Sequence, residues 1–387
     1  MTDQTRIQSI DAVRGFAVLG ILLMNIVGMG LPSGAYIDPT YAGGATGANF
    51  WMWAVNFVVS DGKMRALFSM LFGASMYLIA EGAEGKSPGP AALHYRRMAW
   101  LLVIGLAHAL LLWWGDILVY YAIAGALAFL LRKLPARAQL AVGAMLLALS
   151  MASTLLPAVV AAKASLEMPS DALSEIRAMH GGFLDTVGAR ITNLAYLYPQ
   201  LIIPEGLEAV GQMLVGMALF RMGFFSLGWS SRAYGAVIAA GYLIGLPITI
   251  WLAWRIAASR FHWSVLGVMD GWSAALHPFI ALAHASILLL LIRSGRLTGL
   301  TNRLAAAGRM ALSNYLATSA ITMIVFCGFG FGLFARLERA QLMFVVAGVW
   351  AFILIWSKPW LAQFHYGPAE WLWRSLVLWR PQPFVRR

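Results

Sequence analysis

Long apolar runs separated by short polar segments recur from one end of the chain to the other. A helix needs about 20 predominantly apolar residues to cross the hydrocarbon core of a bilayer, so the pattern predicts about ten membrane-spanning helices. We therefore expect an all-α, polytopic transmembrane helix bundle that forms a single membrane domain over residues 1–387. The predicted spans are residues 12–31, 58–80, 98–115, 116–132, 138–162, 204–225, 234–256, 273–293, 310–334 and 341–357.

The segments between the apolar runs predict further features. Residues 49–59 contain Trp51 and Trp53, and tryptophan suits the headgroup region, so an interfacial or half-span helix is expected there. The third and fourth spans are nearly continuous, and the turn at residues 113–116 must separate them. The tail, residues 358–387, has tryptophans among arginines, which is typical of a basic segment at the membrane interface.

The composition supports a membrane protein. Of the 387 residues, 60% are hydrophobic and 11% are charged, against about 45–50% and about 25% in ordinary soluble domains. So few charges could not cover the surface of a soluble protein, and the apolar surplus is expected to face lipid. The single cysteine, Cys327, excludes an intrachain disulfide and a cysteine metal cluster. Neither H-E-x-x-H nor G-x-x-x-x-G-K-[ST] occurs, so no metal or nucleotide cofactor is evident.

The positions of Lys and Arg predict the orientation. The net charge is +12, but the basic residues are spread between apolar segments, so no nucleic-acid partner is expected. Positive charges favour cytoplasmic loops, and the first outside loop, residues 32–50, has none. Both termini are then cytoplasmic, and the chain is expected to lie in the cell (inner or plasma) membrane with the lipid bilayer as its partner. The cytoplasmic loops would contain Lys86, Arg96, Arg97, Arg132, Lys133, Arg137, Arg221, Arg232, Arg293, Arg296, Arg303 and Arg309.

Three ionisable residues lie at the start of the second predicted span: Asp61, Lys63 and Arg65. Ionisable residues inside a span are costly in lipid and by default indicate a functional site. If this stretch is helical, Asp61 and Arg65 are one turn apart and can pair. The pair would either belong to a functional site or be a structural ion pair that lets the helix enter the bundle.

Arg14 and Asn25 share a face of the first span. Eleven residues at 100° each return to nearly the same side of a helix, about 16 Å further along its axis. The two residues predict a polar stripe from the cytoplasmic mouth toward the outer half of the membrane. Alternatively, Arg14 snorkels to the inner interface and Asn25 bonds a neighbouring helix.

His108 lies near the middle of the third span, and Asp116 follows two turns later at the outer end. A histidine there can exchange protons near neutral pH, and a neighbouring carboxylate or amide could orient it as a general base. His108 is therefore the candidate base, and its candidate partners are Asp61, Asn25 and Asp116. The alternative is a packed histidine whose hydrogen bonds are structural.

The ninth span opens with Arg309 and continues with Asn314 and Tyr315. Arg309 is a candidate for binding an anionic ligand at the cytoplasmic mouth, or else an anchor for the inner end of the helix. Asn314 and Tyr315 are candidates for contacting a substrate.

Several runs of the chain resemble known families. Residues 6–15 resemble the R-x-x-x-[LI]-D-x-x-R-G opening of a superfamily of membrane acyltransferases, which includes the type-3 acyltransferases and the heparan-α-glucosaminide N-acetyltransferase group. The chain more closely resembles the bacterial YeiB-like family of unknown function. The runs that carry this second resemblance are residues 67–73, 105–118, 308–316 and 366–374.

The chain departs from the acyltransferases at their histidines. In type-3 enzymes a histidine follows the R-G arginine by eleven positions, where this chain has Asn25. The heparan group has asparagine there and uses a histidine outside the first span, but the loop 32–50 contains none. His108 is then the remaining intramembrane base. Lys63 and Arg65 loosely resemble the basic pair that type-3 enzymes offer to their acyl donor.

The resemblance implies an acyltransferase that moves an acyl group from acyl-CoA to a hydroxyl or amine of a small-molecule, lipid or glycan acceptor. The residues expected to attract the CoA phosphates are Arg14, Lys63, Arg65 and Arg309. His108 would deprotonate the acceptor. The missing histidines favour instead a transporter or exporter with a proton-coupled path through the same buried ions. A third hypothesis is a non-catalytic membrane component that binds a partner through its basic tail.

Overall fold

The computed structural model describes residues 3–164 and 172–386, and these residues form helices joined by turns and loops, without a β-strand. The helices are α1 (Asp3–Gly30), α2 (Gly47–Val55), α3 (Lys63–Gly82), α4 (Pro90–Leu111), α5 (Leu118–Leu130), α6 (Ala136–Ala164), α7 (Ala172–His180), α8 (Phe183–Arg221), α9 (Ser231–Ala239), α10 (Leu246–Ala258), α11 (Trp263–Ala274), α12 (His277–Arg293), α13 (Thr298–Arg309), α14 (Ala311–Phe326), α15 (Arg339–Gln363) and α16 (Pro368–Leu378). Three short segments are η1 (Ser33–Tyr36), η2 (Asn56–Ser60) and η3 (Ala240–Gly245).

The predicted spans fall mostly on helix in the structure, but the spans 58–80 and 273–293 each contain a break, at residues 61–62 and 275–276. The expected break between the third and fourth spans is confirmed, because α4 ends at Leu111 and α5 begins at Leu118. The expected helix at residues 49–59 is also present, as α2 followed directly by η2. The predicted span 310–334 is shorter than expected, since α14 ends at Phe326.

The largest difference concerns α8. The helix has 39 residues and begins at Phe183, in the segment between the predicted spans 138–162 and 204–225. Residues 165–171 of that segment lie outside the described part of the chain. The sequence prediction missed this half of α8 because Asp185, Arg190 and Pro199 interrupt its apolar pattern. The end of the molecule that contains α7 is therefore more helical than the sequence predicts.

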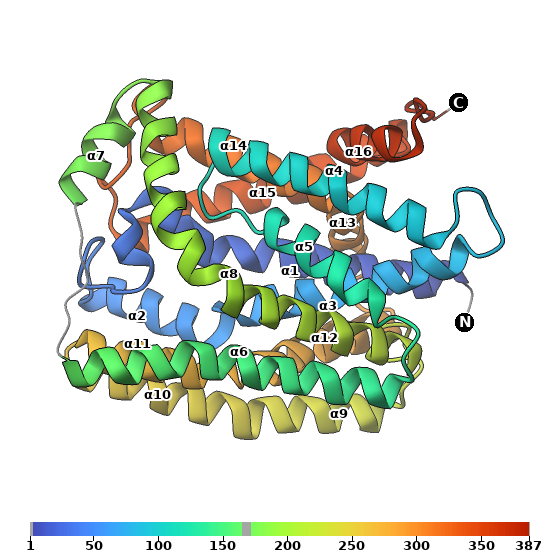
Figure 1. The fold of residues 1–387 in the computed structure, drawn as a ribbon, viewed down its shortest axis with the longest axis horizontal. Coiled ribbons are helices and arrows are strands. Elements are labelled where there is room, and N and C mark those ends of the chain that lie inside the picture. The colour runs from blue at the N-terminus through green and yellow to red at the C-terminus, as the bar shows by residue number, and fades with distance from the viewer. Residues whose placement is uncertain (1–2, 165–171, 387) are drawn as a thin grey trace.

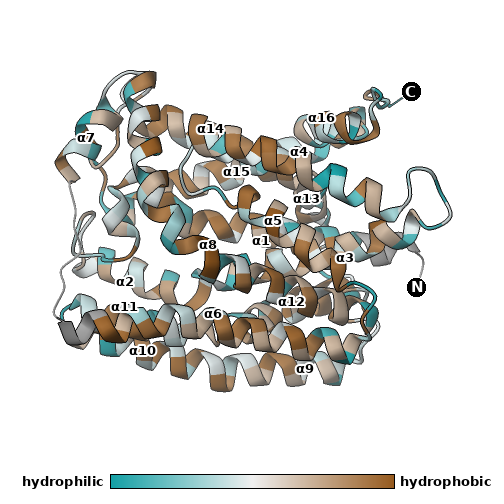
Figure 2. Ribbon diagram, viewed as in Figure 1, coloured by the Kyte–Doolittle hydropathy of each residue, from teal (hydrophilic) through white to brown (hydrophobic). Residues whose placement is uncertain are grey.

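Several helices are long and apolar enough to cross a membrane. Within the described residues they are Gln8–Gly30, Ala136–Val160, Phe183–Arg221, Ser231–Ala258 and Arg339–Gln363. A sixth crossing is available if α11 and α12, which are bent by 52° at the break between them, act as one span. Figure 2 shows apolar residues prominent on peripheral helices such as α6 and α9.

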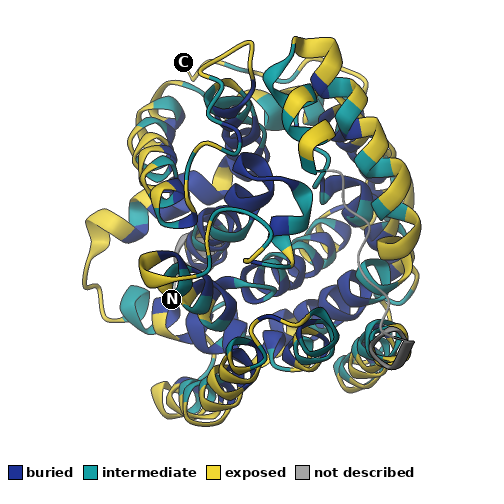
Figure 3. Ribbon diagram, turned by 90° about the vertical axis from the view of Figure 1, so that its left-hand side faces the viewer, coloured by how far each residue is buried: buried dark blue, intermediate teal, exposed yellow. Residues whose placement is uncertain are grey.

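Both chain termini lie at the same end of the bundle, and α7 with the first turns of α8 lies at the other end (Figure 1). Seen from the α7 end, buried residues gather in the centre of the bundle and exposed residues on its outside (Figure 3). In the most apolar part of α1, 72% of the residues are buried, whereas in that of α6 only 11% are buried. α1 is therefore a central helix, and α6 is a peripheral helix whose apolar surface is available to lipid.

The C-terminal tail packs against the bundle. Its first residues continue α15, and α16 lies beside α4 (Figure 1). Trp373 Nε1 donates a hydrogen bond to the carbonyl oxygen of Arg97 at 3.1 Å, and the Arg97 guanidinium lies 4.3 Å from the centre of the Trp373 ring.

Candidate functional site

A cavity of about 2120 Å³ lies among the helices. Its walls come from η1, the turn between α4 and α5, α7, the first half of α8 and α11, which places it toward the end of the bundle away from the termini (Figure 1). Small-molecule pockets usually have about 300–1,000 Å³, so a large or extended ligand would fit here.

Four residues of the predicted site line this cavity: Asn25, Asp61, Arg65 and Asp116. The candidate base, His108, lies behind the wall, and its Nδ1 is 2.8 Å from Asp116 Oδ1. The structure thus brings the predicted residues to one region, with His108 connected to the cavity through Asp116. Of the three candidate partners, Asp116 is the one in contact with His108, at a distance typical of a hydrogen bond but without the alignment of one.

Asp116, His108 and Ser319 form a buried row. Asp116 Oδ2 accepts a hydrogen bond from the backbone N–H of Val119 at 2.7 Å, which holds the carboxylate at the start of α5. His108 Nε2 lies 2.8 Å from Ser319 Oγ on α14. The side chains of His108 and Asp116 are 0% exposed, and Ser319 is 1% exposed. An imidazole is therefore held between a carboxylate and a hydroxyl, shielded from water.

Tyr315 and Asn314, the predicted substrate contacts, lie outside the cavity wall. The Tyr315 ring packs on His108, with 4.8 Å between ring centroids. Asn314 is buried, donates to the carbonyl oxygen of Ala307 at 3.0 Å and accepts from Trp356 Nε1 at 2.9 Å. Because these bonds join neighbouring helices, the structure gives Asn314 a packing role instead of the predicted contact with substrate.

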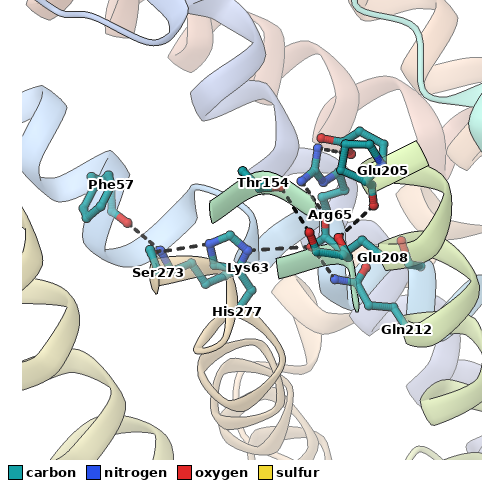
Figure 4. Close-up of polar contacts among 12 residues, drawn as sticks. Phe57, Lys63, Arg65, Thr154, Glu205, Glu208, Gln212, Ser273 and His277 are labelled. Carbon is teal, nitrogen blue, oxygen red and sulfur yellow. Dashed lines mark hydrogen bonds and ion pairs between the residues drawn. The ribbon is translucent and has the colours of Figure 1, made fainter. Parts of the chain in front are cut away.

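Arg65 stands at the centre of an ion network in the cavity wall (Figure 4). Its guanidinium is 2.5 Å from Glu205 Oε2 and 2.8 Å from Glu208 Oε2, both on α8. These acids replace Asp61, the partner suggested by the sequence. The backbone explains the change, since Gly62 has φ +66° and helix α3 begins only after it, so Asp61 and Arg65 do not share a helix face.

His277 and Lys63 extend this region toward α11 and α12 (Figure 4). His277 Nδ1 is 3.7 Å from Glu208 Oε1. Lys63 Nζ donates to the carbonyl oxygen of Phe57 at 2.6 Å and lies 3.5 Å from Ser273 Oγ. The sequence predicted that Lys63 receives the phosphates of an acyl donor. Because Lys63 is 0% exposed and is held by these neighbours, it is not placed to do so.

Arg14 lies far from Arg65 along the bundle. It donates to Asp11 Oδ1 at 2.8 Å and to Ser75 Oγ at 2.6 Å. Ser75 follows Arg65 by ten residues on α3, which is about 15 Å along a helix. The expectation that Arg14 and Arg65 form one basic site is therefore corrected. Arg309, exposed at the end of α13, is close enough to Asp11 to attract it electrostatically, so it belongs with Arg14.

Two of the sequence runs, residues 6–15 and 308–316, have clear packing roles near Arg14. A Cβ atom on Gly308 would overlap the carbonyl oxygen of Asp11, and one on Gly15 would overlap that of Leu304. The glycine after Arg14 therefore lets α1 and α13 touch backbone to backbone.

The sequence prediction missed Glu205 and Glu208 as partners of Arg65, and it missed His277 and Ser319. Glu205 and Glu208 are three residues apart, so they share a helix face, and this spacing was an available signal. Their position beside a long polar segment made an interfacial role equally reasonable. Ser319 had no signal, because single hydroxyl residues are common in packed membrane helices.

Comparison with known proteins identifies the family. A family profile described as "Protein of unknown function (DUF418)" matches residues 219–380. The chain is 32% identical over 391 residues to the uncharacterized protein YeiB of Escherichia coli (strain K12), with 98% of each chain covered. It is 27% identical to the uncharacterized protein YxaH of Bacillus subtilis (strain 168), covering 99% of this chain and 96% of that protein. The chain therefore belongs to the YeiB-like family of proteins of unknown function.

Proposed function

We propose that the chain is a membrane acyltransferase that moves an acyl group from acyl-CoA to a hydroxyl or amine of an acceptor held in the cavity. The observation that carries the proposal is the row Asp116–His108–Ser319, with 2.8 Å on each side of the imidazole. Rows of carboxylate, imidazole and hydroxyl activate the hydroxyl as a nucleophile in many acyl-transfer enzymes. Asp116 borders the cavity with its side chain fully buried, so an acceptor held there lies at the Asp116 end of the row and must move past His108 to reach Ser319.

The proposed reaction has two steps. First, His108 takes the proton of Ser319 Oγ, the Oγ bonds to the acyl carbon, the carbon–sulfur bond of acyl-CoA breaks, and the proton passes to the departing sulfur. Second, the acceptor attacks the acyl carbon, the bond between that carbon and Ser319 Oγ breaks, and the proton of the acceptor passes through His108 to Ser319 Oγ. A small rotation of either side chain would align Asp116 Oδ1 with Nδ1, 2.8 Å away, and so hold the proton on Nδ1 and leave Nε2 free to accept. Because Ser319 is 1% exposed, the reaction requires the helices packed around Ser319 to move apart.

The acyl donor is proposed to enter from the inner end of the bundle. Arg14 and Arg309 lie there, and guanidinium groups bind phosphates through charge-assisted hydrogen bonds. Arg65 is left out of donor binding, because Glu205 and Glu208 already neutralise it and it lies toward the opposite end.

The proposal includes ten crossings of the cell membrane with both termini in the cytoplasm, so that the cavity faces outward. It is supported by the two termini lying at one end of the bundle (Figure 1) and by the excess of Lys and Arg in the loops of that side. We expect a reporter active only in the cytoplasm to be active after fusion to Arg387. Activity there of a reporter that works only outside the cytoplasm would contradict the proposal.

The direct test uses purified protein in neutral detergent with acetyl-CoA labelled in its acetyl group. After acid quenching, label should be covalently bound to the unaltered protein and to Ser153→Ala, a control serine that lines the cavity. It should be absent from Ser319→Ala and His108→Gln. Equal labelling of Ser319→Ala would exclude Ser319 as the acyl carrier. If the unaltered protein shows no labelling and releases no CoA, the result counts against an enzyme.

A second candidate function is transport of a small molecule through the cavity. The ion network of Arg65, Glu205 and Glu208 favours it, because buried ionisable groups between membrane helices often form proton paths. Transport would appear in proteoliposomes as uptake of a labelled solute driven by a pH gradient, without release of CoA. That uptake should be lost in Glu208→Gln and survive His108→Gln, which is the opposite of the pattern for acyl transfer.

A further inference from the structure

Two carboxylates in the cavity wall, those of Asp61 and Asp270, lack a hydrogen bond or ion pair to any other described residue. Both line the cavity. Other acids of the same wall are already used: Asp38 accepts from Thr40 at 2.7 Å, and Glu175 accepts from the backbone N–H of Ser33 at 2.9 Å. Asp61 and Asp270 are therefore available to a ligand.

Two further polar groups beside them are unpartnered and more than nine-tenths buried. Ser60 is 3% exposed, and its Oγ has no hydrogen-bond partner among the described residues. Asn25 is 8% exposed, and no hydrogen bond joins its amide to another described residue. Both line the cavity. A buried polar group without a partner costs free energy, so these groups point to a ligand that supplies the missing hydrogen bonds.

The local charge is unbalanced toward the negative. Asp61 and Asp270 are close enough to repel each other, and the ammonium of Lys63 and the guanidinium of Arg65 act on Asp270 from nearby. Arg65 is already shared by Glu205 and Glu208. Four carboxylates thus face two basic groups, with His277 beside Glu208, which leaves a surplus of two negative charges when all four are ionised. Burial raises the pKa of Asp270 to about 7, so the full surplus is present only above that pH. A ligand with positive charge would remove this surplus.

Aromatic side chains complete the wall. Trp53, Phe57, Tyr36 and Trp263 line the same cavity, and aromatic faces attract ammonium groups. Tyr36, in η1, keeps its hydroxyl proton, because burial raises its pKa and the negative charge of Asp61 raises it further. It can therefore donate a hydrogen bond while the carboxylates accept.

We infer that Asp61 and Asp270 form a binding site for an organic cation, with two ammonium groups as the best match to the two surplus charges. Ser60, Asn25 and the aromatic wall would hold the rest of the ligand. The site does not depend on acyl transfer, since it would bind such a molecule whether the protein acylates it or carries it.

Three compounds of similar length test the inference: cadaverine with two ammonium groups, n-pentylamine with one, and 1,5-pentanediol with none. Binding to the purified protein in neutral detergent is measured by calorimetry and by the fluorescence of the cavity tryptophans. We expect cadaverine to bind most tightly, pentylamine more weakly and pentanediol not detectably. Raising the salt concentration should weaken cadaverine binding, since it screens charge.

Variants then locate the site. Asp61→Asn and Asp270→Asn should each weaken cadaverine binding about 10-fold or more, the usual scale for a hydrogen bond to a charged group. Asp38→Asn is the matched control and should bind cadaverine as the unaltered protein does. Equal binding of the three compounds to the unaltered protein, or no binding of any, would overturn the inference. This result does not depend on the variants, so it holds even if a variant fails to fold. So would full cadaverine affinity in folded Asp61→Asn and Asp270→Asn.

Discussion

Two buried histidines of this protein, His108 and His277, each face a carboxylate, but at different distances. His108 Nδ1 is 2.8 Å from Asp116, and its Nε2 is 2.8 Å from Ser319. His277 Nδ1 is 3.7 Å from Glu208, and its Nε2 is 3.5 Å from Ser273. The first ring is in close contact on both sides, with a hydrogen bond only on the Ser319 side, and the second ring is in looser contact.

The difference arises from the other partners of the two carboxylates. Glu208 lies 2.8 Å from Arg65 and accepts a hydrogen bond from Gln212 at 2.7 Å. Arg65 therefore compensates its charge without a contribution from His277. Asp116 has no basic residue other than His108 within ion-pair distance in the described chain. A carboxylate without another cation can orient an imidazole as a base, whereas one inside an ion network contributes to holding helices together.

The largest expected effect is on His108. His108→Gln keeps much of the size and hydrogen bonding but removes proton exchange, so turnover per folded molecule should fall by about 10²–10⁴-fold, the usual share of general acid–base catalysis. Acyl-donor binding should stay the same, since arginines are proposed to hold the phosphates. The measurement is acetyl transfer or CoA release, normalised to folded protein. Full specific activity would remove His108 from the mechanism.

Asp116→Asn should reduce turnover by about 10²-fold. An amide can donate to Nδ1 and so favour the tautomer in which Nε2 cannot accept a proton. The comparison variant is Glu208→Gln, which changes an acid beside His277 and should leave most of the acyl-transfer activity. If both variants lose activity equally, the distinction drawn between the two carboxylates is wrong.

Removing Arg65 should affect stability more than chemistry. Arg65→Gln leaves Glu205 and Glu208 facing each other without their cation. Loss of a partner from a fully buried ion pair costs about 3–5 kcal/mol; Arg65 is 33% exposed, so solvent screening should reduce this to about 1–3 kcal/mol. Thermal unfolding in detergent measures the loss. Adding Glu205→Gln should recover part of it, and Arg309→Gln, at an exposed arginine, should have little effect.

The smallest expected effect is that of His277→Gln. Because His277 contacts Glu208 only at 3.7 Å, acyl-transfer turnover should change by less than about threefold, well under the share of a general base. A loss as large as that of His108→Gln would place the chemistry at the ion network instead of the Asp116–His108–Ser319 row.

Much of the helical layout could be predicted from the sequence. The apolar runs matched helices, and the break around residues 113–116 lies where expected, because run length and turn residues are local properties. The first half of α8 could not be predicted in this way, since Asp185 and Arg190 interrupt its apolar pattern. Its stability depends on contacts with the rest of the bundle.

The sequence by itself determined an all-helical fold, the family to which the chain belongs and the unusual ionisable residues inside apolar runs. Only the tertiary structure decided which of these residues meet. Arg65 reaches Glu208 across 143 positions of sequence, and His108 reaches Ser319 across 211. Such pairings depend on how packed helices rotate and slide against one another, and no spacing within a single helix contains that information.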